Sequence, residues 1–165
     1  MARRSLLAKT VGAARLEADA FREREDDRGA LAQATAVVAL AAVSEGVGAL
    51  DAGVLPAAGA FLATFAGWLL WAALARGLGA LLAGGEGAPH GLLAALGFAQ
   101  APRLLGFLGY LPVAGWIGSL VIAGWVLVAG LLGARVNSRM GPVRALAVVL
   151  PGWTGLVVLR AGFAW

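Results

Sequence analysis

Long apolar stretches alternate with short polar breaks along this chain, and the alternation predicts membrane-spanning helices. An α-helix rises about 1.5 Å per residue, so about 20 apolar residues cross a hydrocarbon core that is about 30 Å thick. Stretches of about this length occur five times, separated by glycines, prolines and charged residues that favour turns. They are residues 29–50, 56–75, 92–111, 116–134 and 145–162. We therefore expect an all-α fold, a polytopic transmembrane helical bundle of about five spans that forms one membrane domain over residues 29–165.

The first 28 residues form a separate, charged segment that contains seven Arg or Lys and six Asp or Glu. Apolar residues recur within it at spacings of three and four, at Leu7, Val11, Ala14, Ala18 and Phe21. Such spacing places them on one face, so we expect an amphipathic helix between Ser5 and Arg28 that is cytoplasmic or interfacial. We expect it to pack against its own bundle or to lie on the membrane interface; docking to a partner is the alternative.

The composition excludes several other classes of protein. Hydrophobic residues make up 61% of the chain and charged residues 13%, with a mean hydropathy of +0.85, which is far more apolar than a soluble domain. Cysteine is absent and histidine occurs once, at His90, so thiolate chemistry is excluded and a metal site is not expected. No recognised catalytic motif is present. We expect no enzyme activity, no cofactor and, because acids balance the N-terminal cations, no nucleic-acid partner.

The positions of the cations predict the orientation, because Lys and Arg next to short loops stay on the cytoplasmic side. With a cytoplasmic N-terminus, five spans place Arg76 and the Arg135–Arg144 loop on that side as well. The outer turns near Asp51 and Pro112 then contain no cation. We therefore expect the C-terminus on the opposite side of the membrane.

Three charged residues lie inside the predicted spans, where each costs about 2.5–3.5 kcal/mol on insertion scales. Glu45, Arg103 and Arg160 lie roughly 22, 17 and 22 Å from the inner ends of their spans, so all three reach the same outer half. We expect Glu45 to pair with Arg103 or Arg160 and to form a buried polar cluster with Gln100. The alternative for Glu45 and Arg160 is that their side chains extend to the outer interface.

Prolines and small residues within the spans predict how the helices bend and pack. Pro102 and Pro151 are expected to break their helices, because proline lacks a backbone N–H and clashes with the preceding turn. In lipid, small residues let helix backbones approach closely, and contacts within the chain are the simplest result. The expected helix-packing residues are Gly59, Ala63, Gly67 and Gly118.

The segment Leu96-Gly97-Phe98-Ala99-Gln100-Ala101-Pro102-Arg103-Leu104-Leu105 resembles the middle of the membrane domain in the YIP (Ypt/Rab-interacting protein) family. That family has a Gly-aromatic-x-x-x-Pro segment in the third of five spans, and the resemblance implies the same layout and orientation. For eukaryotic members it implies Rab-GTPase binding, but this chain lacks their long aromatic-rich N-terminal region, so no GTPase partner is inferred. The excess of arginine over the single lysine suggests a GC-rich bacterial source, hence a bacterial-type member in the inner membrane.

The leading hypothesis for function is a non-enzymatic membrane protein that acts through helix contacts, as an accessory or assembly subunit of an inner-membrane complex. Its partners would be membrane lipids and other membrane proteins, or a second copy of itself. One alternative is a small transporter or channel that uses a polar cluster around Arg103. Another is a lipid-binding or membrane-organising protein that acts through residues 5–28.

Overall fold

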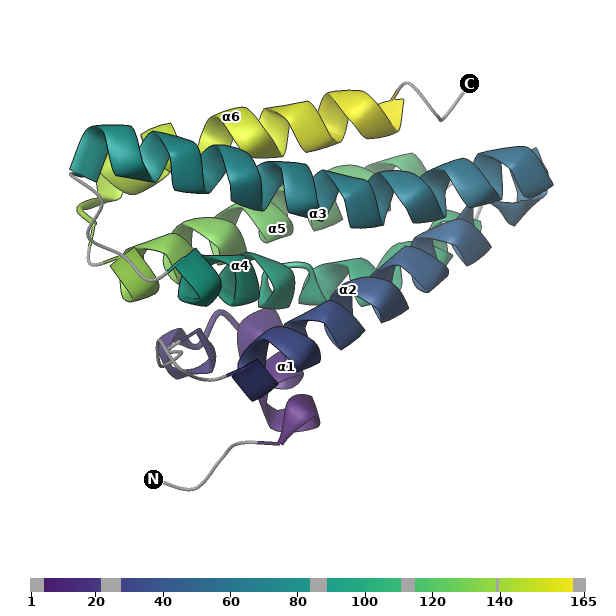
Figure 1. The fold of residues 1–165 in the computed structure, drawn as a ribbon. Helices are drawn as coiled ribbons and strands as arrows, with labels where there is room; N and C mark the ends of the chain where they lie inside the picture. The colour runs from purple at the N-terminus through teal and green to yellow at the C-terminus, as the bar shows by residue number, and fades with distance from the viewer. Residues whose placement is uncertain (1–4, 22–27, 84–88, 111–114, 139, 162–165) are drawn as a thin grey trace.

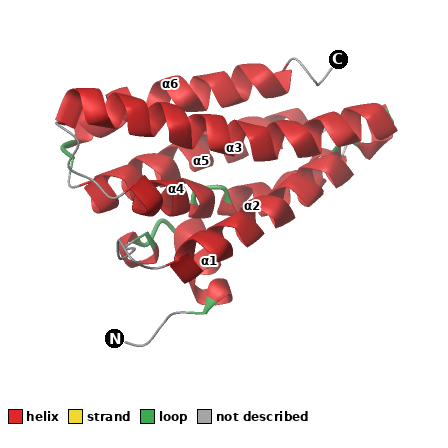
Figure 2. Ribbon diagram, in the orientation of Figure 1, coloured by secondary structure: helices red, strands yellow, loops and turns green. Residues whose placement is uncertain are grey.

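The computed structural model describes residues 5–21, 28–83, 89–110, 115–138 and 140–161, and all regular elements within these ranges are helical (Figure 2). Elements labelled η are 3-10 helices. In chain order the elements are α1 (Leu6–Ala14), η1 (Ala18–Ala20), α2 (Arg28–Gly48), η2 (Leu50–Ala52), α3 (Val54–Ala83), α4 (Pro89–Phe98), η3 (Ala101–Tyr110), α5 (Gly115–Ser138) and α6 (Pro142–Ala161).

Five segments of the described chain are long and apolar enough to cross a membrane, which confirms the expected all-α polytopic bundle. Four of them are the continuous helices α2, α3, α5 and α6, and the third along the chain is made of α4 and η3 together. The long helices run across the molecule side by side, with α1 beneath them in the view of Figure 1. α2 packs against α3, α4 and η3, while α6 packs against α3 and α5.

The broken third segment lies at the centre of this bundle. Within its apolar window 72% of the residues are buried, against 28% in α6, because α2, α3 and α5 all pack around it. Two tryptophans of α3 donate hydrogen bonds to main-chain carbonyls of α4 and α6, which in lipid have no water to bond. Trp68 Nε1 donates to Leu93 O at 3.2 Å, and Trp71 Nε1, fully buried, donates to Val149 O at 2.8 Å.

Two helices continue past residues that were expected to end or break them. α3 runs through Arg76 to Ala83, because arginine is a good helix former and this side chain is exposed. The predicted break at Pro151 is wrong, since α6 continues through it. A proline removes only one backbone donor, and Pro151 lies on the exposed face of α6, where its ring displaces no neighbouring helix.

The expected packing residues divide into two groups. Gly59, Ala63 and Gly67 are all buried on α3, and a Cβ added to Gly67 would lie 3.1 Å from Leu156 Cγ of α6. Around Gly118, by contrast, no atom of the described residues lies within 4 Å of an added Cβ. The small face of α3 is therefore used within the chain, and Gly118 is not.

The N-terminal segment contains a helix, but it is shorter than the expected 5–28 and buries a different face. α1 ends at Ala14, and Leu16 follows with a left-handed φ of 59°. Leu7 is 76% exposed, whereas Lys9 is buried with its ammonium over the Phe98 ring, 5.4 Å from the centroid. The chain reversal brings the fully buried Phe21 onto α5, where a Cβ added to Gly133 would lie 3.1 Å from Phe21 Cδ1. The segment thus packs against its own bundle.

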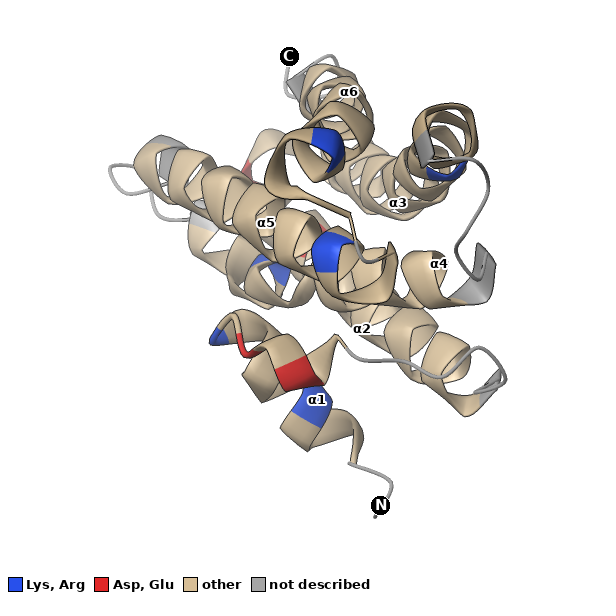
Figure 3. Cartoon of the chain, turned by 90° about the vertical axis from the view of Figure 1, so that its left-hand side faces the viewer, with Lys and Arg blue, Asp and Glu red and all other residues tan. Residues whose placement is uncertain are grey.

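Exposed cations gather at one end of the bundle. Arg76 lies near the C-terminal end of α3, Arg135 near that of α5, and Arg144 in the first turn of α6. Figure 3 looks onto this end and shows basic residues on these three helices facing the viewer. The three helix ends that carry these cations therefore lie on the same side of the bundle.

Candidate functional site

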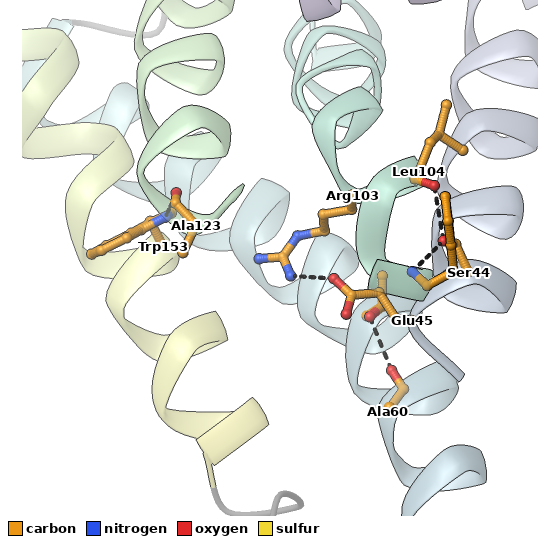
Figure 4. A network of polar contacts seen from close by, with 9 residues as sticks. Ser44, Glu45, Ala60, Arg103, Leu104, Ala123 and Trp153 are labelled. Carbon is orange, nitrogen blue, oxygen red and sulfur yellow. Dashed lines mark hydrogen bonds and ion pairs between the residues drawn. The ribbon is translucent and has the colours of Figure 1, made fainter. Parts of the chain in front are cut away.

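An ion pair between α2 and η3 lies inside the bundle. Arg103 Nη1 donates to Glu45 Oε1 at 3.1 Å, and the two side chains are only 3% and 9% exposed (Figure 4). The partners are 58 residues apart in the chain, so the contact joins the first membrane segment to the third. Each charge is thereby neutralised where solvation by water is poor.

The break in the third segment determines how Arg103 reaches this position. Ala99 N still bonds to Ala95 O, at 2.9 Å, but Gln100 N bonds to Gly97 O and Arg103 N to Gln100 O, at 3.1 and 2.9 Å. These tighter turns coincide with Pro102, which lacks an N–H and disfavours an α-conformation in the residue before it. The segment therefore continues from Ala101 as the 3-10 helix η3.

Ser44, next to Glu45 on α2, secures the backbone of η3. Its Oγ donates to Leu104 O and accepts from the N–H of Phe107, both at 2.9 Å. In a membrane interior, irregular backbone is tolerated where protein groups satisfy it. The adjacent residues Ser44 and Glu45 therefore hold the main chain and the charged side chain of the same short helix (Figure 4).

Two glycines outside the set of predicted packing residues allow α2 and η3 to approach each other closely. A Cβ on Gly48 would lie 3.1 Å from the Gly106 carbonyl carbon and nearer still to its oxygen. A Cβ on Gly106 would lie 2.8 Å from Glu45 Cδ. Each glycine follows a charged residue by three positions, as Glu45-x-x-Gly48 and Arg103-x-x-Gly106, and that repeated spacing was the available signal.

The other members of the expected polar cluster take different places. Gln100 is fully buried, yet within the described part of the chain neither its amide nitrogen nor its amide oxygen has a hydrogen-bond partner, and Arg103 Nε also lacks one there. Gln100 therefore lies beside the ion pair in the chain without bonding to it. The side chain of Arg160 lies outside the described residues. Within those residues, no three His, Asp or Glu side chains gather as metal ligands would.

Replacing Ser44 with Ala is expected to destabilise η3 locally. It removes the acceptor for Phe107 N–H and the donor to Leu104 O, and such bonds contribute about 0.5–1.5 kcal/mol each. Amide hydrogen exchange at Phe107 should quicken by about tenfold in reconstituted protein, as about 1.4 kcal/mol of local stability predicts.

Thr35→Ala on the same helix is the matched control, because Thr35 Oγ1 bonds only to Leu31 O within α2. It should leave exchange at Phe107 unchanged. Equal acceleration in both variants would mean that the Ser44 contact does not hold η3.

Comparison with known proteins gives one finding. A family model described as the Yip1 domain matches residues 15–161, from the residue after α1 to the end of α6. No curated protein and no solved structure matches the chain significantly.

Proposed function

Because the chain belongs to the Yip1 domain family, we propose that it is a non-enzymatic multi-pass membrane protein that acts through helix contacts, as an accessory or assembly subunit of a membrane complex. The family match includes the segment around Pro102 on which the resemblance to YIP proteins rests, and it confirms that resemblance. One observation carries the proposal of a contact role: three glycines of α5 and α6 have open space around them, with no other described part of the chain packed on them.

The glycines of these two helices differ in their surroundings. Cβ atoms added to Gly130 and Gly152 would collide with the Trp71 side chain, so both positions are filled within the chain. At Gly118 and Gly124 of α5 and Gly155 of α6, no described atom lies within 4 Å of an added Cβ. Small residues allow close helix approach in lipid, where apolar surface alone drives no association. These three positions therefore suit a further helix.

The low burial of α5 and α6 supports the same docking position for a further helix. The apolar windows of α5 and α6 are 33% and 28% buried, the lowest values among the five membrane-length segments. Trp153 Nε1 donates to Ala123 O at 2.9 Å, so α5 and α6 are joined beside Gly124 and Gly155. The occupant we propose is a transmembrane helix of another membrane protein, seated along this pair.

The proposed location is a bacterial inner membrane, with a cytoplasmic N-terminus and the C-terminus on the opposite side. The exposed Arg76, Arg135 and Arg144 at one end of the bundle support this orientation, because cations are retained on the cytoplasmic side.

The test is purification of the tagged full chain from its native membrane in mild detergent or nanodiscs. We expect stoichiometric companions with the wild-type chain, and their loss on Gly118→Leu and Gly124→Leu, because leucine fills the surface that a partner helix would occupy. Gly77→Leu is the control, since Gly77 on α3 is also exposed with no described neighbour within 4 Å. Recovery of the wild-type chain only as a lone monomer would contradict the proposal.

A second candidate is a small transporter or channel, and the specific observation in its favour is Gln100. Its buried amide has no partner among the residues that the structure describes and lies at a broken membrane segment, as polar groups do in the discontinuous helices that bind solutes in transporters. Solute flux in reconstituted vesicles that disappears with Gln100→Leu would favour this function. Absence of flux across a broad panel of solutes would exclude it for those solutes.

A further inference from the structure

Three polar groups at the break between α4 and η3 are buried and have no hydrogen-bond partner among the described residues. They are the amide nitrogen and oxygen of Gln100, whose side chain is fully buried, and Nε of Arg103, which is 2% exposed. A buried donor or acceptor without a partner is costly in any protein, and more so in a membrane interior. Retention of three of them in one place points to a ligand.

The backbone places these groups on the same side of the chain. Arg103 N bonds to Gln100 O at 2.9 Å, which closes a turn of the 3-10 type. In such a turn, residues three apart have eclipsed side chains. The side chains of Gln100 and Arg103 therefore extend from the same side of the backbone at the break. The guanidinium at the end of the Arg103 side chain bonds to Glu45.

Most polar side chains on the surrounding helices bond to groups other than Gln100; the exception is Gln33 on α2, whose amide oxygen is also buried without a partner among the described residues. Ser44 bonds to the backbone of η3, Thr64 Oγ1 donates to Ala60 O, and Trp68 Nε1 donates to Leu93 O. None of these bonds leads to Gln100. The missing partner must therefore come from outside the described chain.

The chemistry of the three groups defines the ligand. Gln100 Nε2 and Arg103 Nε are donors and need an acceptor, whereas Gln100 Oε1 needs a donor. An anion would approach the Glu45 carboxylate, and a cation would approach the Arg103 guanidinium, in a region where like charges repel strongly. A neutral molecule that both donates and accepts meets all of these conditions.

We propose that the break between α4 and η3 is a binding site for such a neutral molecule, and that water occupies it. Water accepts from two donors and donates to an acceptor, and buried waters commonly make about three hydrogen bonds to groups of this kind. The bundle then contains an internal water molecule next to the ion pair of Glu45 and Arg103. This site is independent of the proposed docking face on α5 and α6.

Nuclear magnetic resonance on the ¹⁵N-labelled full chain in nanodiscs tests the proposal. We expect direct cross-relaxation between water and both the Gln100 amide and the Arg103 Nε–H, distinguished by its sign from chemical exchange. Trp71 Nε1–H is the control, because it is fully buried but already bonded to Val149 O, and it should show no water signal. In Gln100→Met, which also assigns the amide resonance, the water signal at Arg103 should be lost.

Titrations separate the possible occupants. A water signal that urea and glycerol do not displace supports bound water, and saturable displacement by either supports the same chemistry with a small solute as occupant. A saturable shift of the Gln100 amide with sodium chloride would overturn the neutral-ligand proposal, since an ion would then be bound. Absence of any water signal at both groups, with the Trp71 resonance well resolved, would overturn it altogether.

Discussion

Replacing Glu45 with Gln is expected to lower the free energy of unfolding by about 3–5 kcal/mol, because it leaves the Arg103 guanidinium buried without a counter-charge. The pair is bonded at 3.1 Å and almost fully enclosed, so bulk water cannot reach the guanidinium, and a neutral group beside it does not replace the negative charge of the carboxylate. The measurement is reversible unfolding in mixed micelles with increasing denaturing detergent, followed by circular dichroism.

The matched control is Asp51→Asn, which removes a carboxylate that is exposed in η2 and should change stability by no more than about 0.5 kcal/mol. The double replacement Glu45→Leu with Arg103→Leu should recover most of the loss, because apolar pairs often substitute for buried ion pairs at little cost. Equal stability of Glu45→Gln and Asp51→Asn would show that the pair does not stabilise the bundle.

Replacing Gly48 with Ala is expected to destabilise the protein by about 1–3 kcal/mol or more, although alanine is the better helix former. The added methyl group would overlap the carbonyl of Gly106 and lie 3.4 Å from Phe107 Cα, all of which is main chain. Backbone cannot move aside as a flexible side chain does, so α2 and η3 must separate. Thermal unfolding in detergent measures the loss.

Gly124→Ala on α5 supplies the opposite expectation. No described atom of another element lies within 4 Å of the new Cβ. The substitution should therefore raise the free energy of unfolding by up to about 0.5–1 kcal/mol, because alanine restricts the unfolded chain and favours a helix more than glycine does. A destabilising effect of similar size in both variants would mean that close contact between α2 and η3 is not what Gly48 provides.

These expectations connect the polar centre with the proposed contact role. Ser44, Glu45 and Gly48 on α2 together hold the broken third segment inside the bundle. The segment so held is packed by α2, α3 and α5, which leaves α6 and the outer part of α5 as the least buried surfaces. A stable interior is thus a condition for presenting these outer helices to a partner.

Much of the architecture follows from hydropathy and from a few charged residues. Lipid offers no water to backbone N–H and C=O groups and a helix bonds them within its own segment, so five long apolar stretches implied five membrane-length helical segments. The partners available to Arg103 were few, because Glu45 is the single acidic residue within the predicted spans. The position of Pro102 likewise predicted where the third segment changes its helical form.

Packing decided the features that hydropathy does not encode. A helix in water buries its apolar face, so periodicity reveals that face; a helix in lipid is apolar all round, and periodicity is silent about its neighbours. Hence the close contacts that Gly48, Gly106 and the glycines around Trp71 make with neighbouring helices became visible only once the helices were assembled. At Pro151 the sequence predicted a break that packing did not require, since its ring lies on an exposed face of α6 and the helix continues through it. The face that α1 buries also differs from the one its apolar spacing predicted, because Leu7 is exposed while Lys9 packs on Phe98.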